Sequence, residues 1–386
     1  MKKSISLILA LVIAFSGISL LTYAGDEAEL VAPELIECTA DNECITLCFE
    51  GVASAEYYNI YRKTNGGSWE KAASKYDGTV YCDYSVKSGN VYTYTAKAGA
   101  GEIFGSYDKE GLSVKYVKLP TPVISSVKFG VNKITVSWKK ISSCDGYILY
   151  RRTDKTDWEE IGEFKNTVTQ YTDTALKSNN KYYYTLKCFK GELVSNYNPG
   201  GKGTFFLAVP VKLSASSDTK GVKITWNKVS GANKYIIGRK TSKTDWVKIA
   251  EVGNVSSYTD KTAKTSVTYS YTVVSCKDSF KGLYKEAGVK GRYVPVVTLK
   301  SVKNTSKGAV TLNWSLSEGS SGYIVYKKAN GGSSWSKVAT VKGAAKLTYT
   351  DKTAKKGVTY IYNVKPYYGT CTGSFKNGGV KIKVTK

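Results

Sequence analysis

Residues 134–150 read ITVSWKKISSCDGYILY, and this stretch decides the fold. It opens with an alternating apolar strand that ends at Trp138, and a second apolar strand begins nine residues later at Tyr147. Alternation of apolar and polar residues with a period of two is typical of a half-buried β-strand. The stretch therefore predicts two neighbouring strands that bury a Trp and a Tyr in one core.

The same pattern occurs four times along the 386 residues. Working outward, each copy begins near a proline, and successive prolines lie 89, 88 and 85 residues apart. Equal spacing of four copies indicates a tandem array of similar modules. The core aromatics that end the first strand are Phe49, Trp138, Trp226 and Trp314, and each is followed nine residues later by Tyr58, Tyr147, Tyr235 or Tyr323.

The second half of each copy repeats as well. A Tyr-x-Asp motif is followed by a Tyr-x-Tyr strand, and Gly, Asn and Ser residues separate the short apolar runs. Short strands joined by such turns are typical of a two-sheet antiparallel sandwich. No stretch keeps a helical period, so we expect almost no helix.

These motifs resemble those of fibronectin type III domains, in particular the tandem copies found in secreted bacterial proteins. The resemblance covers about residues 33–386, with Phe49 in place of the usual Trp in the first copy and three extra residues before Trp314. It implies an all-β fold of four tandem immunoglobulin-like (fibronectin type III) β-sandwich modules in an extended array after an N-terminal signal peptide. It also implies tyrosine corners, in which a hydroxyl bonds nearby backbone, at Tyr92, Tyr182, Tyr269 and Tyr360.

The expected boundaries follow from the prolines and from the N-terminus. The joints between copies are short and contain proline, which restricts rotation and predicts a monomeric rod. The expected divisions are a signal peptide (1–24), an N-terminal linker (25–32) and fibronectin III-like modules at 33–119, 120–209, 210–294 and 295–386.

The first 24 residues have the features of a secretory signal. Lys2 and Lys3 precede an apolar run, and small residues near Ala24 offer a cleavage site. An uncleaved membrane anchor is the alternative, because the run is long for a signal. No later run is apolar for long enough to span a bilayer, so we expect a secreted protein without a transmembrane segment after cleavage, with association to the cell wall as one location.

Charge is distributed unevenly over a chain whose formal net charge is +25. The four copies carry net charges of −3, +5, +10 and +14 in chain order. The electric field of the strongly positive copies attracts anionic polymers, including wall polymers and mucins. Lysines that only decorate exposed strands and discourage edge pairing are the alternative. Nucleic acid is not an expected partner, since no nucleic-acid-binding motif is present.

Eight cysteines are concentrated in the first two copies. In a secreted chain, even numbers within one module suggest disulfides. The resemblance implies that the strands near Cys144 and Cys188 are antiparallel neighbours, so we expect these two cysteines to pair. In the first copy the sequence cannot choose among three connectivities. The favoured pairs there are Cys38–Cys44 and Cys48–Cys82, and free thiols throughout are the alternative.

A second tryptophan follows the third strand of every copy. Four such rings could form stacking platforms for sugars. The alternative is that each ring covers the outer face of its own sheet and the stems of nearby Arg or Lys residues. These candidate binding residues are Trp69, Trp158, Trp246 and Trp335.

No motif points to catalysis, a cofactor or a metal. The chain has no histidine, and the fourth copy has only two carboxylates, too few to suggest a glycosidase pair in a cleft. We expect a secreted, non-enzymatic binding or adhesion protein that presents basic faces and loops to a polymer or protein ligand. A passive spacer is the second hypothesis, and an accessory protein of carbohydrate-active enzymes the third.

Overall fold

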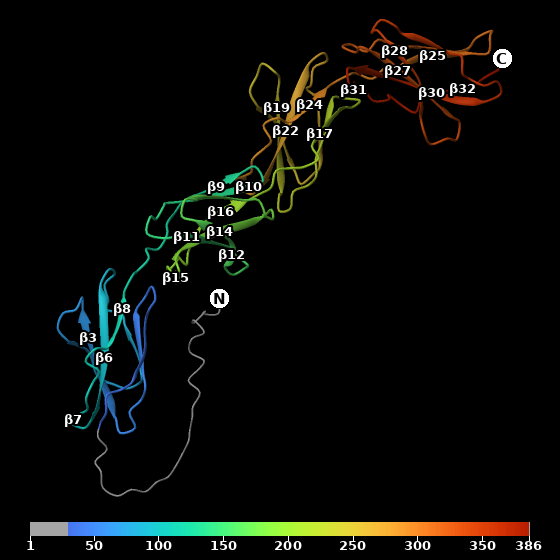
Figure 1. The fold of residues 1–386 in the computed structure, drawn as a ribbon. Helices are drawn as coiled ribbons and strands as arrows, with labels where there is room; N and C mark the ends of the chain where they lie inside the picture. Colours follow the sequence, from blue (N-terminus) through green and yellow to red (C-terminus); the bar gives the residue numbers. More distant parts are fainter. Residues whose placement is uncertain (1–29, 386) are drawn as a thin grey trace. The chain divides into compact units, whose positions relative to one another are not determined.

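The computed structural model describes residues 30–385, and the predicted signal peptide and most of the predicted linker lie outside them. No helix occurs between residues 30 and 385, so the all-β expectation is confirmed (Figure 1). Correspondingly, none of the described residues forms a helix that could cross a membrane.

Each repeat folds into a module of two antiparallel sheets. In the first, the strands are β1 Leu35–Ala40, β2 Ile45–Phe49, β3 Tyr57–Thr64, β4 Glu70–Tyr76, β5 Val80–Asp83, β6 Val91–Ala100, β7 Ile103–Phe104 and β8 Leu112–Lys115. In the second, they are β9 Ile124–Gly130, β10 Lys133–Trp138, β11 Gly146–Thr153, β12 Glu159–Lys165, β13 Gln170–Asp173, β14 Asn180–Lys190, β15 Leu193–Val194 and β16 Lys202–Phe206.

The last two repeats follow the same plan. In the third, the strands are β17 Ser214–Ser217, β18 Val222–Thr225, β19 Lys234–Lys240, β20 Val247–Gly253, β21 Ser257–Asp260, β22 Thr268–Lys277, β23 Phe280–Lys281 and β24 Val289–Arg292. In the fourth, they are β25 Leu299–Asn304, β26 Val310–Trp314, β27 Gly322–Ala329, β28 Ser336–Lys342, β29 Thr348–Asp351, β30 Thr359–Tyr368, β31 Cys371–Thr372 and β32 Val380–Lys383.

All four modules have one topology. The smaller sheet has the order first–second–fifth strand, as in β1-β2-β5, and the larger sheet has the order fourth–third–sixth, as in β4-β3-β6. The eighth strand pairs with the first part of the sixth strand, and the two-residue seventh strand pairs with its last residues. This repetition confirms the tandem sandwich arrangement expected from the spacing of the aromatics.

By its contacts the chain divides into two compact units, and the division runs through the second module. One unit holds the chain up to Lys128 together with Thr135–Thr172 and Lys181–Thr204. The other holds Phe129–Ile134, Asp173–Asn180 and Phe205–Lys386.

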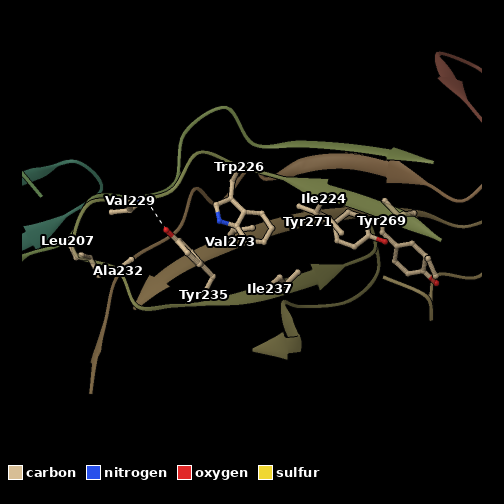
Figure 2. Close-up of a cluster of buried hydrophobic side chains, with 12 residues drawn as sticks. Leu207, Ile224, Trp226, Val229, Ala232, Tyr235, Ile237, Tyr269, Tyr271 and Val273 are labelled. Atoms are coloured by element: carbon tan, nitrogen blue, oxygen red, sulfur yellow. Dashed lines mark hydrogen bonds between the residues drawn. The ribbon is translucent and has the colours of Figure 1, made fainter. Parts of the chain in front are cut away.

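The core of each module forms around an aromatic pair between the sheets. In the third module, the ring centroids of Trp226 and Tyr235 lie 5.4 Å apart, and the Tyr235 hydroxyl accepts a hydrogen bond of 2.7 Å from the Val229 amide (Figure 2). Aromatic pairs at this separation stabilise a core beyond the effect of area burial. The corresponding centroid distances are 4.8 Å for Phe49–Tyr58, 5.7 Å for Trp138–Tyr147 and 5.3 Å for Trp314–Tyr323.

The tyrosines at the start of the sixth strand differ in their surroundings. The Tyr92 hydroxyl accepts a hydrogen bond of 2.8 Å from the Lys87 amide, and the Tyr269 hydroxyl accepts one of 3.3 Å from the Lys264 amide. Tyr182 is buried, whereas Tyr360 is only partly buried. The two hydroxyl–amide bonds have the form of a tyrosine corner.

Candidate binding faces

The candidate tryptophan of each repeat (Trp69, Trp158, Trp246 or Trp335) lies on the larger sheet, immediately before its fourth strand. All four rings are partly buried rather than open to solvent. Each lies under a basic side chain from the end of the third strand of its own module. The distances from cation to ring centroid are 4.3 Å for Lys63–Trp69, 5.0 Å for Arg152–Trp158, 4.6 Å for Lys240–Trp246 and 5.2 Å for Lys328–Trp335.

A second aromatic ring packs against each tryptophan, edge-on in the first three modules and tilted in the fourth. It comes from the loop before the eighth strand, and in every module it lies four residues before a glycine. Sequence reasoning missed this ring, although the repeated aromatic-x3-Gly spacing could have revealed it. The ring centroids lie 6.3 Å apart for Trp69–Tyr107, 6.4 Å for Trp158–Tyr197, 5.8 Å for Trp246–Tyr284 and 5.0 Å for Trp335–Phe375.

The glycine of that spacing leaves room for the tryptophan ring to approach the backbone. Gly379 has a φ of +90°, and a Cβ atom there would lie 3.0 Å from the Trp335 ring and 2.4 Å from the Tyr362 carbonyl oxygen. Glycine is the residue that adopts this backbone region and leaves room for such an approach. Gly201 and Gly379 therefore leave room for the rings of Trp158 and Trp335. In the sequence, each of them is visible only as part of a Gly-Gly pair. Gly111 and Gly288 have the same role in the first and third modules.

A buried carboxylate ties the two sheets together beside the core of the first, third and fourth modules. Asp260 is fully buried, and its Oδ2 atom accepts hydrogen bonds from Arg239 at 2.7 Å and from the Tyr271 hydroxyl at 2.9 Å. Its Oδ1 atom accepts from the Thr262 amide at 3.0 Å, which is an Asx-type turn. The Tyr-x-Asp motif marks this residue in the sequence but does not indicate the ion pair. The equivalent bonds are Asp83 with Arg62 and Tyr94, and Asp351 with Lys327 and Tyr362.

The pKa of this carboxylate reflects two opposing effects. Burial alone would raise the pKa of Asp260, but hydrogen bonds from Thr262, Arg239 and Tyr271 outweigh burial and lower the pKa. Burial, together with the neighbouring Asp260 charge, raises the pKa of the Tyr271 phenol. Both groups therefore keep their usual charge states at neutral pH. A buried, ionised and fully bonded carboxylate of this kind is structural, because substrate cannot reach it.

The cysteines are all free thiols in this structure. The Cys144 thiol contacts the Ile141 carbonyl oxygen at 3.3 Å, and the Cys188 thiol contacts the Pro120 carbonyl oxygen at 3.2 Å. The predicted disulfides therefore remain predictions.

In the first module, four cysteines lie on the smaller sheet or at its edge. The sulfur atoms of Cys44 and Cys82 lie 3.8 Å and 3.6 Å from the Thr46 hydroxyl oxygen. Burial raises the pKa of Cys38 to about 12 and that of Cys44 to about 11. Such thiols are poor nucleophiles, since the reactive species is the thiolate. By strand register, Cys38 lies opposite Leu47, and Cys48 lies opposite Glu37.

The surfaces of the larger sheets that carry these tryptophans present cations and ring edges but no reactive group. Within residues 30–385, no cluster of three or more His, Cys, Asp or Glu side chains is placed to hold a metal ion. The tryptophan rings lie against the cations of their own modules, so an external ligand would meet ammonium or guanidinium groups and ring edges first. This chemistry suits binding of sugars or anions rather than bond cleavage.

The strand order, the buried aromatic pair and the repeat define tandem antiparallel β-sandwich modules with the fibronectin type III fold. No family model matches the chain. Among curated proteins, it is 24% identical over 351 residues to exoglucanase B of Cellulomonas fimi, which covers 82% of this chain and 30% of that protein. It is also 35% identical over 89 residues to an amylopullulanase of Thermoanaerobacterium saccharolyticum, which covers 22% of this chain and 7% of that protein. The chain thus spans less than a third of either relative.

Solved structures with similar chains are fibronectin type III proteins. A Fn3-like protein from Clostridium thermocellum is 30% identical, covering 22% of this chain and 93% of its own, with a TM-score of 0.21. The FN1–FN3 domains of chicken CNTN1 are 15% identical, covering 69% of this chain and 97% of their own, with a TM-score of 0.28. A two-domain segment of chicken tenascin is 17% identical, covering 45% and 99%, with a TM-score of 0.25.

Proposed function

We propose that this chain is an extracellular, non-enzymatic binding protein whose larger sheets contact a polysaccharide. The observation that carries the proposal is the cluster of cation, tryptophan and second aromatic ring, which recurs on one sheet of all four modules. Four copies of a weak contact give useful avidity when a polymer can engage several of them. The signal-like N-terminus favours export, and a place at the cell wall fits a polymer ligand.

The relatives support a glycan setting. Their names, an exoglucanase and an amylopullulanase, refer to enzymes that act on glucans. Since this chain spans only 30% and 7% of them, we assign to it a binding or accessory part and not their catalysis. No carboxylate pair in a cleft supports hydrolysis within the described modules.

A passive spacer is the competing function. It is favoured by the fact that each tryptophan is partly buried under a cation of its own module, which explains the repeat through packing alone. In that case, the four faces would have no ligand.

Polysaccharide and protein arrays probed with residues 25–386 separate these functions. We expect reproducible binding to at least one polysaccharide, with loss of that binding when Trp69, Trp158, Trp246 and Trp335 are all replaced by leucine. Trp226→Phe is the control, because it changes a tryptophan in the core and leaves the faces intact. Calorimetry must show that both variants remain folded. If the folded wild-type chain bound nothing on any array, the spacer function would be the one that remains.

A further inference from the structure

The fourth module has a basic face that is free of carboxylates. Strand partners in an antiparallel sheet point to the same side. Lys328 lies opposite Ile361, which in turn lies opposite Lys381, and Tyr326 lies opposite Lys337. We call this surface of β27, β28, β30 and β32 the module 4 face. Its lysines are Lys328, Lys337, Lys342, Lys365, Lys381 and Lys383.

The two carboxylates of residues 296–386 lie elsewhere. Asp351 is fully buried between the sheets and is bonded to Lys327 and Tyr362. Glu318 lies in the loop between β26 and β27, outside the strands of the face. The six lysines of the face therefore have no carboxylate of their own module beside them.

Aromatic rings position two of these lysines without neutralising them. The Lys365 ammonium lies 4.3 Å from the Phe375 ring centroid and 5.8 Å from that of Tyr326. The Lys328 ammonium lies 5.2 Å from the Trp335 centroid. A ring attracts a cation through its quadrupole and leaves the full positive charge in place. The charges therefore remain available to an external anion.

The corresponding faces of the middle modules are partly neutralised. In the third module, Glu286 accepts hydrogen bonds from Lys240 at 3.0 Å and from the Trp246 indole at 2.7 Å. In the second module, the carboxylate Glu160 lies opposite Tyr150, where the fourth module has Lys337 opposite Tyr326. The first repeat has a net charge of −3, against +14 for the fourth.

We infer that the module 4 face binds acidic polysaccharide, a glycan whose sugars carry carboxylate or sulfate groups. This inference rests on the proposed polysaccharide function and names the class of ligand. The lysines pair with the anionic groups, and the edges of Trp335 and Phe375 contact the sugar rings between them. A single-stranded nucleic acid fits less well, since bases need open ring faces on which to stack, and here ammonium groups lie over the rings.

The test uses the chain as residues 25–386 and polygalacturonic acid as the probe, with dextran and duplex DNA as comparisons. In the face variant, Lys328, Lys337, Lys365 and Lys381 become glutamine. In the control variant, four exposed loop lysines of the same module become glutamine, namely Lys346, Lys352, Lys355 and Lys356. The two variants lose the same charge. A third variant with arginine at the four face positions keeps the charge.

We expect the face variant to bind polygalacturonic acid about ten-fold or more weakly at low salt, because four ion pairs are lost. The loop variant should stay within about three-fold of the wild type, and the arginine variant should bind like it. Equal losses in the face and loop variants would overturn the inference, since net charge alone would then explain binding. The inference would also be overturned if the wild-type chain bound DNA more tightly than polygalacturonic acid and the face variant lost that binding to the same extent.

The inference and the proposed function fail in different ways. If the wild-type chain binds a neutral polysaccharide on the arrays but not polygalacturonic acid, the inference is wrong and the proposed function stands. If the chain binds no polysaccharide of either kind, the proposed function itself is wrong.

Discussion

The buried core tryptophan of the last three modules carries a cost as well as a benefit. Trp226 is 3% exposed, and its indole N–H has no acceptor, as is also true of Trp138 and Trp314. A buried polar group without a partner costs about 1–3 kcal/mol. The burial of the ring outweighs that cost. The first module places Phe49, which has no N–H group, at the equivalent position.

Substitution of Trp226 should therefore depend on the replacement. Trp226→Ala should destabilise the third module by about 3–5 kcal/mol, because it leaves a large cavity. Trp226→Phe should cost less than about 1.5 kcal/mol, since it removes the unpaired N–H group and keeps most of the ring. Chemical unfolding of residues 25–386 measures both. Equal destabilisation by Ala and Phe would contradict this account of the core.

At the scale of elements, the buried aspartate joins strands that belong to different sheets. Asp260 ends β21 in the smaller sheet, whereas Arg239 and Tyr271 lie on β19 and β22 of the larger sheet. The ion pair therefore crosses the sandwich. Removing one partner of a buried pair is strongly destabilising, because the other charge is left uncompensated.

Asp260→Asn should destabilise the third module by about 3 kcal/mol at neutral pH. The pKa of Asp260 is lowered below its ordinary 3.8, so its contribution to stability is present above that value. That contribution is lost as the pH falls from about 3.8 through the lower pKa of the folded state.

Unfolding measured from pH 7 to pH 2 should thus bring the wild type and the Asn variant closer together in acid. Other groups titrate in both chains, so their effects cancel in the difference in stability between the two. One such group is Glu251, whose pKa is lowered to about 2 by Lys248 and Lys234. A difference in stability that stays constant across this range would contradict the role of the Asp260 charge.

At the scale of the molecule, side chains couple the third and fourth modules within one compact unit. Arg292 on β24 is 6% exposed, and its guanidinium carbon lies 3.5 Å from the centroid of the Tyr368 ring at the end of β30. The Ser374 hydroxyl donates a hydrogen bond of 3.1 Å to the Ser217 carbonyl oxygen across the same junction. A desolvated cation–ring contact contributes about 2 kcal/mol.

Arg292→Ala should therefore uncouple the unfolding of these two modules. In calorimetry of residues 25–386, we expect their transitions to separate or broaden, with a loss of about 2 kcal/mol of coupling. Lys290→Ala is the matched control, because Lys290 is an exposed residue of the same strand. An unchanged calorimetric profile in Arg292→Ala would show that the junction contact does not couple the modules.

The number of modules, their all-β class and their core aromatics followed from spacing and alternation alone. Those features depend on local periodicity, and four copies of one pattern make it visible in a single chain. The Asx-type turn at the Tyr-x-Asp motif was predictable for the same reason, since its hydrogen bond spans two residues.

The partners of these residues needed the folded chain. The bond from Asp260 to Arg239 joins residues 21 positions apart, and the contact of Trp335 with Phe375 joins residues 40 positions apart. Pairing of strands across and between sheets brings such residues together, and the repeat pattern does not encode which side chains then meet. The net charge of the fourth repeat was countable from composition, but the face that collects its lysines, and the burial that removes Asp351 from that surface, arise only when the two sheets pack.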